Sequence, residues 1–480
     1  MRADTNLIPV ESDVQEYVQK PHIIVDNDLA LAFKELRMNS LLKAAKIKKR
    51  TGHCVNRIMF DLLLIPFLMF DSVHLFVRAQ YENASTHKNR FYRFLQQANY
   101  DWRRLQMNLA YRIYHVIADD SPEKEFYVLD DSTIEVKGKL VEMASYVYDH
   151  CSKKPVLGFQ KLVLGIFNGH HFVPIGQRIC SGKRRPAAQS KATKYQKIPK
   201  ADRIDRNSPG AIQRDEIIKQ TKLDKACSLL KDAQIRGFKA STLLMDSWFC
   251  FNSFIVKIVK RFKIHVICQL KNLPRTNRYL YNNKTYTLKA LFTTMAKPKL
   301  RTVKKYQFQQ AIITVAIPET KLKLKIVFVQ KACKDTWYAF AATDVKLSAK
   351  DILEAYAQRW SIEVFFKNCK QYLNYGKEQM SNLDSIIACD AMVMIRYALL
   401  TYIAAKEKAK FYITFDSLRD QNSKRCFGIK LLQYFLDQLR FVIDKLHQYV
   451  QNDCKNQALQ LLQVIRNFDI DYLTVQPQMK

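Results

Sequence analysis

The spacing of apolar positions changes twice along the chain, which separates two helical regions from a mixed region between them. From about residue 28 to 117, apolar residues recur three and four positions apart with Lys and Arg between them, as in NRFYRFLQQANYDWRRLQMNLAYRIYHVI. This period is that of amphipathic helices. We therefore predict an all-helical unit at 1–120, and the same spacing predicts a helical region at 380–480.

The middle of the chain predicts strands that alternate with helices. EFYVLDDSTIEV, KLVLGIFNGH and HFVPIG have β-type patterns, and Asn168-Gly169 is a strong hairpin signal. A basic loop is predicted at 182–210, followed by one helix from Ala211 to Gly237. The short apolar runs STLLMDSWF and HVICQLK predict buried strands, with a helix between them. Residues 121–271 therefore form the first part of a mixed α/β core.

Two further segments complete that core. Several β-type stretches at 272–346 (NRYLYNNKTYTL, VKKYQFQQAIITVAI, KLKIVFVQKA and TWYAFAAT) predict a β-rich insertion. LSAKDILEAYAQRWSIEVFFKNCKQYL then predicts one long helix, within a segment assigned to 347–379. The expected fold is thus an α/β core with an inserted antiparallel β region, flanked by helical N- and C-terminal units.

Charge narrows the class of partner. Lys and Arg exceed Asp and Glu by 78 − 44 = 34 in 480 residues, an excess that points to nucleic acid or a membrane surface. The basic residues are spread along the chain and mixed with aromatic residues, which favours nucleic acid. The most apolar run, Ile58 to Phe70, is interrupted by Asp61 and is too short to span a bilayer, so no membrane association is expected. The N-terminus shows no signal peptide, and the eleven cysteines form no CxxC pair, which predicts a cytoplasmic protein with reduced thiols.

One stretch of the long helix, YAQRWSIEVFFKNCK, carries polar groups on a single stripe. Tyr356, Arg359, Glu363 and Lys370 project within roughly 60° of one another at about 100° per residue. A solvated charged face explains such a stripe in most helices. The alternative is a site for a polyanion in which the carboxylate binds a metal.

Three acidic residues stand out by their positions. Asp130 follows the apolar run FYVL, Asp246 follows LLM, and Glu363 lies in the long helix. Carboxylates at strand ends can converge at one sheet edge, where a facing helix adds a third, and such oxygen ligands suit Mg²⁺. Two ions would serve phosphodiester chemistry, and Mn²⁺ would substitute for Mg²⁺.

Each acid also has an ordinary structural interpretation. Asp131 competes with Asp130 as the residue that points into the site. For Asp246, capping of the following helix is an equal alternative to a place in the metal site. Glu363 alone reads as a surface residue, because Trp360 and Phe366 give its helix an apolar face.

Taken together, these residues resemble a known family. The spacing Y-x2-R-x3-E-x6-K at 356–370 is similar to the YREK signature of the IS-four-type DDE transposases of bacterial insertion sequences. VLDDST resembles the family's first acidic motif, and LLMDSWF resembles the second. A β-rich insertion between the second and third acids is also typical of that family. The resemblance covers about 125–375.

The resemblance implies a ribonuclease-H-like core in which Asp130, Asp246 and Glu363 are the metal-binding catalytic residues. Arg359 and Lys370 match the family's cations that grip transposon-end phosphates, and Tyr356 matches a tyrosine that contacts the same DNA. By the same resemblance, the tryptophan of KDTWYAFAAT would stack on a base flipped out of the duplex. The equal alternative for this residue, Trp337, is packing within the insertion.

The implied function is a DNA transposase of the bacterial cytoplasm, associated with the nucleoid. It would bind the terminal inverted repeats of its element as a homodimer, cleave double-stranded DNA and join the 3′-OH to target DNA. Residues 1–120 would bind the element ends, and 380–480 would contribute to dimerisation. Two rival hypotheses are a metal-dependent nuclease of the same fold without strand transfer and a catalytically inactive DNA-binding derivative.

Overall fold

The computed structural model describes most of the chain up to residue 406. The described ranges are 28–49, 54–78, 88–118, 124–138, 140–181, 205–303, 308–331, 335–377 and 380–406, with 22–23, parts of 420–442 and 469–470. Most of the basic loop predicted at 182–210 therefore lies outside the described residues. The same is true of most of the helical region predicted beyond residue 406.

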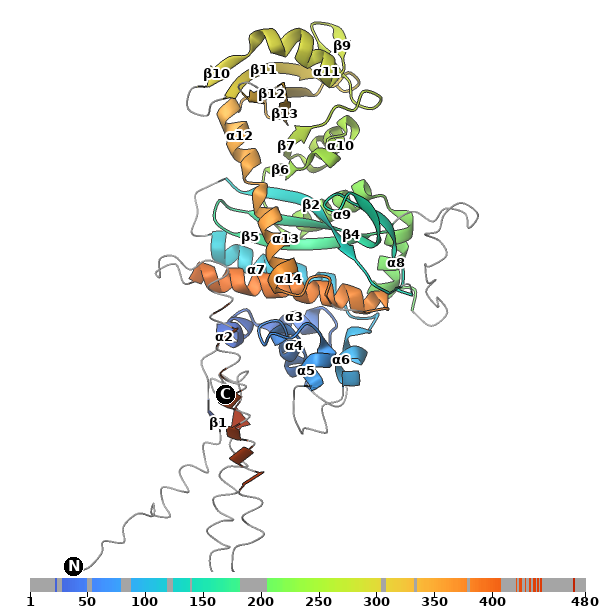
Figure 1. Ribbon diagram of the computed structural model, residues 1–480, viewed down its shortest axis with the longest axis vertical. Helices are drawn as coiled ribbons and strands as arrows, with labels where there is room; N and C mark the ends of the chain where they lie inside the picture. The colour runs from blue at the N-terminus through green and yellow to red at the C-terminus, as the bar shows by residue number, and fades with distance from the viewer. Residues whose placement is uncertain are drawn as a thin grey trace, which may run out of the picture.

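Short helices form the N-terminal part of the described chain, where the sequence predicts them. They bury the apolar positions of the three- and four-residue spacing, such as Ile58, Phe60 and Leu109, each 0% exposed. Figure 1 shows the first five of these helices, in blue, below the central sheet, whereas the last, in cyan, lies against the sheet. They are α2 (Asp28–Glu35), α3 (Met38–Ala44), α4 (Val55–Leu64), α5 (Val73–Arg78), α6 (Lys88–Leu95) and α7 (Trp102–Ala118).

A mixed sheet forms the core. Its strands are β2 (Phe126–Glu135), β3 (Ser145–Asp149), β4 (Lys154–Phe167), β5 (Phe172–Cys180), β6 (Thr242–Met245) and β7 (His265–Leu270). The spatial order is β5–β4–β2–β6–β7, with the first three strands antiparallel and the last three parallel. The predicted hairpin joins β4 to β5, where Gly169 has φ 94° and the Asn168 side chain accepts hydrogen bonds from the backbone N–H groups of His170 and His171.

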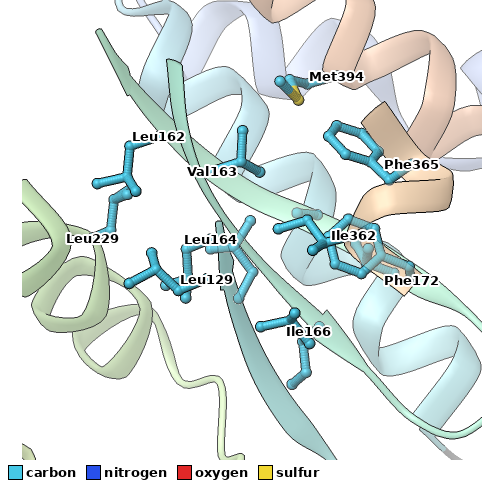
Figure 2. Packing of buried hydrophobic residues seen from close by; sticks show 14 of the residues in the cluster. Leu129, Leu162, Val163, Leu164, Ile166, Phe172, Leu229, Ile362, Phe365 and Met394 are labelled. Carbon is cyan, nitrogen blue, oxygen red and sulfur yellow. The ribbon is translucent and has the colours of Figure 1, made fainter. Parts of the chain in front are cut away.

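Helices cover both faces of this sheet. Leu162 of β4 packs toward Leu229 of α9 (Lys222–Arg236), whereas Ile362 and Phe365 of α13 (Trp360–Tyr372) lie on the other side of the strands (Figure 2). α10 (Asn252–Phe262) joins β6 to β7 and contacts α9. The two faces are referred to below as the α9 face and the α13 face.

The single helix predicted from Ala211 to Gly237 is two helices. α8 (Pro209–Lys219) ends at Gln220, and α9 starts afresh after Thr221. Thr221 and Asp224 form a reciprocal capping box at this start, so local side-chain hydrogen bonds outcompete a continuous helix. The prediction was wrong at this point because the apolar spacing continues across the break.

The β-rich segment extends the core sheet. β13 (Trp337–Ala342) pairs antiparallel with β7, and β12 (Lys323–Lys331) and β11 (Phe308–Ala316) follow outward. The shorter strands are β8 (Tyr279–Tyr281), β9 (Lys284–Tyr286) and β10 (Arg301–Val303). The short helix α11 (Leu288–Leu291) is an addition that the pattern did not predict. Thr287 starts it by accepting a hydrogen bond from the Ala290 N–H.

The long helix predicted through the YREK stretch is also divided. α12 (Ala349–Ala357) and α13 are separated at Gln358 and Arg359, where backbone N–H groups bond three residues back, as from Arg359 to Tyr356 at 3.0 Å. The division lets α12 pack on the inserted strands and α13 on the core. It also leaves Trp360 63% exposed, so the prediction that Trp360 belongs to the apolar face was wrong.

α14 (Leu383–Lys406) is the most apolar helix and runs between the core and the N-terminal helices (Figure 1). By length and composition it could cross a membrane, but it is buried within the protein. Its charged residues have partners there. Asp384 pairs with Arg214, which also pairs with Glu142, and Asp390 pairs with Lys161. These contacts are those of a core helix in a folded protein.

Candidate active site

The register of two parallel strands brings Asp130 and Asp246 side by side. β2 and β6 pair up to Leu129 and Met245, and the two aspartates are the next residues on their strands. Asp246 does lie at the end of its strand, as predicted. Asp130 does not, because β2 continues to Glu135 and Asp130 pairs with Val163 of β4. The edge of the sheet at this point is formed by the end of β6, whereas β2 continues beyond it.

A capping interaction explains why β6 stops at Met245. The Asp246 carboxylate accepts a hydrogen bond from the Trp248 N–H at 3.4 Å and starts a short 3₁₀ turn over Ser247–Phe249. The capping interpretation of Asp246 is therefore confirmed. It leaves the second carboxylate oxygen for other ligands, so capping and a place in the site are not exclusive.

Glu363 reaches the same place from the first turn of α13 through a shared arginine. The Arg359 guanidinium donates to Asp130 Oδ2 at 2.9 Å and also to the Glu363 carboxylate. The side chain of Arg359 is 13% exposed, that of Asp130 17% and that of Glu363 33%. Arg359 therefore faces the sheet, and this part of the stripe is not a solvated surface.

The two neighbouring aspartates face different helices. Asp131 forms an ion pair with Lys222, the first residue of α9. Asp130 forms one with Arg359 beside α13. Successive residues of a strand point to opposite faces, which produces this separation. The Lys222 Nζ also lies 3.7 Å from the centroid of the Trp248 ring, so one cation links the segments that carry both acidic motifs.

The electrostatics of Asp130 follow from this crowding. The pKa of Asp130 is raised to about 7, first by burial and then by the nearby carboxylates of Asp131 and Asp246, while Arg359 lowers it. A carboxyl group that is this sensitive to neighbouring charge favours a bound cation at the same edge.

The remaining stripe residues also face inward. Lys370 Nζ donates to the backbone oxygen of Thr133 on β2 at 3.2 Å, and burial lowers its pKa. The Tyr356 hydroxyl lies 3.4 Å from Gln269 Oε1 of β7, and its ring packs 4.9 Å from that of Phe340. Burial raises the pKa of Tyr356, so this phenol stays a neutral hydrogen-bonding group.

Trp337 begins β13 at the edge where β7 ends. Ala339 pairs with Leu270, the last residue of β7, which places Trp337 just beyond it. Its ring stacks on Phe292 with centroids 4.3 Å apart and 16° between planes, and it is half-buried. The packing interpretation of this residue is therefore confirmed for one face of the ring. Its contact with DNA stays a prediction.

The donor set suits a hard divalent cation. Asp130, Asp246 and Glu363 offer only carboxylate oxygens, the ligands that Mg²⁺ and Mn²⁺ prefer. Arg359 places a positive charge between Asp130 and Glu363, which is where such a set attracts a cation. Within the described ranges, no three acidic, His or Cys side chains converge closely enough to hold an ion while the guanidinium lies there.

Sequence reasoning missed two residues of this site, Lys222 and Trp248. Trp248 was open to discovery, because it stands two residues after Asp246 in the stretch LLMDSWF. Lys222 carried no signal, because it is one of 78 Lys and Arg residues and its role depends on where α9 begins.

Two family models match overlapping parts of the chain. One, described as a DDE superfamily endonuclease, matches residues 72–282, and the other, a transposase DDE domain, matches residues 219–399. Both support a DDE transposase family. The first match includes the edge with Asp130 and Asp246, and the second includes Asp246 and Glu363. The DDE matches thus support nuclease activity on DNA, and such endonucleases generally use divalent metals. A search of curated proteins found no match.

Proposed function

We propose that the chain is an IS-four-type DDE transposase that cleaves the terminal inverted repeats of an insertion sequence and joins them to target DNA. The observation that carries the proposal is the adjacency of Asp130 and Asp246 on paired parallel strands, with Arg359 connecting Asp130 to Glu363. The strand order β5–β4–β2–β6–β7, three antiparallel strands followed by two parallel ones, supports a ribonuclease-H-like core.

Asp130, Asp246 and Glu363 would hold two Mg²⁺ ions. Bound there, such ions would supply the positive charge that activates an attacking oxygen and stabilises the leaving oxygen of a phosphodiester. The chain's own contribution is placement. The β2–β6 register fixes Asp130 beside Asp246, and the packing of Ile362 and Phe365 on the core fixes the turn that carries Glu363.

Arg359, Lys370 and Tyr356 would hold the DNA. Arg359 presents a planar fork suited to a phosphate, and Lys370 presents a point charge on the same helix. Tyr356 stays protonated and donates a hydrogen bond. Trp337, at the same sheet edge, would stack on a base through the ring area that Phe292 leaves uncovered.

The outer regions have separate proposed roles. The N-terminal helices, with basic residues between their buried positions, would bind the element ends. The region 380–480 would contribute to a homodimer in the DNA complex. The five divisions at 1–120, 121–271, 272–346, 347–379 and 380–480 describe this plan, although β13 joins the inserted strands to the core sheet without a gap.

A cleavage and joining assay tests the function. Protein, Mg²⁺ and duplexes from both flanks of the coding region are combined, with wild type compared with Glu363→Gln. The matched control is Glu354→Gln, which changes an exposed acid on α12. Wild type and the control should cut near the element ends and yield joined products, and Glu363→Gln should do neither. Equal cleavage by Glu363→Gln would refute the site. Cleavage without joined products would favour a nuclease, and binding without cleavage an inactive derivative.

A further inference from the structure

The edge strand β3 carries two exposed tyrosines that the catalytic site does not use. Burial alternates along β3, so that Ser145 and Val147 are buried while Tyr146 and Tyr148 are 43% and 48% exposed. Two large aromatic side chains, two residues apart on one face of a strand, leave an apolar patch in water. Such a patch on a strand indicates a partner.

The strand register places this pair on the α13 face, the same face as Asp130. Tyr146 pairs with Leu157 and Tyr148 with Pro155, while Asp130 pairs with Val163 on the same β4 strand. Cross-strand partners share a face, and positions 155, 157 and 163 of β4 have the same parity. The two tyrosines therefore continue the surface on which Asp130, Glu363 and Lys370 lie.

Lys370 connects the stripe to this hairpin. It contacts Thr133 of β2, and its charge interacts with Asp149 and Cys151 at the turn between β3 and β4. The exposed surface that begins with the proposed phosphate contacts on α13 thus continues directly onto the β3–β4 hairpin.

The charges at this turn favour an anionic partner. Lys153 is exposed there, and the His150 ring packs 5.1 Å from that of Tyr148. Asp149, the acidic residue of the turn, accepts a hydrogen bond from the Ser152 N–H and is thereby engaged within the turn itself. Aromatic rings interleaved with cations are the pattern of surfaces that follow a nucleic-acid strand.

We propose that Tyr146, Tyr148 and Lys153 form a second DNA-binding surface, which holds the DNA that continues beyond the cleavage site. Lys153 binds a phosphate, and the tyrosine rings pack on the sugars and bases of that segment. This inference rests on the proposed function, because it requires that the DNA bound by Tyr356, Arg359 and Lys370 continues onto the β3–β4 hairpin. It assigns the hairpin a role in affinity and not in chemistry.

The test compares two duplexes from the flanks of the coding region by fluorescence anisotropy. The short duplex ends at the mapped cleavage position. The long duplex continues beyond that position. Tyr146→Ala/Tyr148→Ala should weaken binding of the long duplex about tenfold, and the short one little. Lys153→Ala should reduce the salt slope for the long duplex by about 1. Lys260→Ala, on α10 at the opposite face, is the charge control.

Three results separate the possibilities. Unchanged affinity of the double tyrosine variant and of Lys153→Ala for the long duplex overturns the proposal, while wild-type cleavage leaves the proposed function intact. A changed oligomeric state of the tyrosine variant without DNA, with unchanged DNA affinity, assigns the patch to a protein contact and also overturns it. Absence of DNA binding and cleavage by wild type refutes the proposed function itself. Tyr146→Phe/Tyr148→Phe, which keeps the rings, should bind as wild type does.

Discussion

Arg359 donates a hydrogen bond to Asp130 at 2.9 Å from the turn between α12 and α13, and its other terminal nitrogen contacts Glu363. One guanidinium therefore bridges two of the three carboxylates that we propose as metal ligands. The same side chain is the proposed phosphate contact of the YREK stripe. Because its N–H groups cannot serve carboxylates and phosphate at once, occupancy of the site by metal and DNA should change what Arg359 binds.

Arg359→Ala tests this competition through stability. In chelator, the variant should lose about 1–3 kcal/mol of unfolding free energy, because Asp130 and Glu363 lose their shared counter-charge. Mg²⁺ should then stabilise Arg359→Ala more than wild type, since no guanidinium has to leave the carboxylates. Thermal unfolding with and without Mg²⁺ measures both effects. An equal Mg²⁺ shift in the two proteins would contradict the competition.

The same variant should bind DNA with a weaker dependence on salt. Loss of one phosphate contact reduces the slope of log K against log salt concentration by about 1. Arg359→Lys keeps the charge but not the planar fork, so its slope should stay near that of wild type while its affinity falls. A slope unchanged in Arg359→Ala would count against the phosphate contact.

The partition of Asp130 and Asp131 between opposite faces predicts different effects for the two substitutions. Asp130→Asn should reduce cleavage by about a thousandfold or more, because the side chain beside Asp246 loses its charge. Asp131→Asn loses only the ion pair with Lys222, so cleavage should fall about tenfold or less. Single-turnover cleavage at saturating DNA measures both rates. The reverse order would assign the site to Asp131.

Asp130 should also make stability depend on pH when metal is chelated. The pKa of Asp130 is raised from 3.8 to about 7 by burial and by Asp131 and Asp246. Between these values the folded chain binds more protons than the unfolded chain, so this group's contribution to the unfolding free energy falls as pH rises. In Asp130→Asn this group cannot ionise, so the fall in unfolding free energy with rising pH is removed. The variant should therefore be more stable than wild type at about pH 8, on the order of 2 kcal/mol, and closer to wild type at about pH 5.

Chemical unfolding of both proteins across that pH range, in chelator, gives the comparison. Asp215→Asn changes an exposed aspartate on α8 and should show no such pH-dependent difference. A difference between Asp130→Asn and wild type that does not grow with pH would show that Asp130 already ionises at its ordinary pKa in the folded chain.

The sequence predicted the parts of this site that depend on local pattern. The apolar runs before Asp130 and Asp246 located two strands, and the spacing from Tyr356 to Lys370 located the helix that faces them. The residues before each aspartate are buried and apolar, so these runs are hard to mistake. A solvated charged face is more common than the inward orientation of Arg359 and Lys370. Only the packing of α13 on the sheet could establish that these side chains face inward.

What the sequence did not predict depends on contacts between distant segments or on small local hydrogen bonds. The breaks at Thr221 and Arg359 interrupt apolar patterns that continue across them, so periodicity alone does not detect them. The partition of Asp130 and Asp131 requires the positions of α9 and α13 relative to β2. The link from Lys222 to Trp248 joins residues whose proximity depends on where α9 begins.

Lys222 has contacts that come from the structure and from no sequence motif. Its Nζ pairs with Asp131 and lies over the Trp248 ring, and the side chain is 10% exposed. Lys222→Met keeps the length of the side chain but removes the charge, which leaves Asp131 without this partner. We expect the β2 and β6 segments to lose their fixed spacing, so the Mg²⁺ concentration for half-maximal cleavage should rise about tenfold. Lys222→Arg should restore it, because Arg also pairs with carboxylates and stacks on aromatic rings.

A purely structural role would lower stability without changing metal affinity, so Mn²⁺ binding by Lys222→Met is measured directly by electron paramagnetic resonance. Lys219→Met, which changes a 71% exposed lysine three residues earlier, is the matched control. Weaker Mn²⁺ binding in Lys222→Met, with DNA affinity unchanged, supports positioning of the carboxylates by Lys222. Unchanged Mn²⁺ binding with a lower melting temperature would reduce Lys222 to a packing residue, since the carboxylates would then hold their arrangement without it.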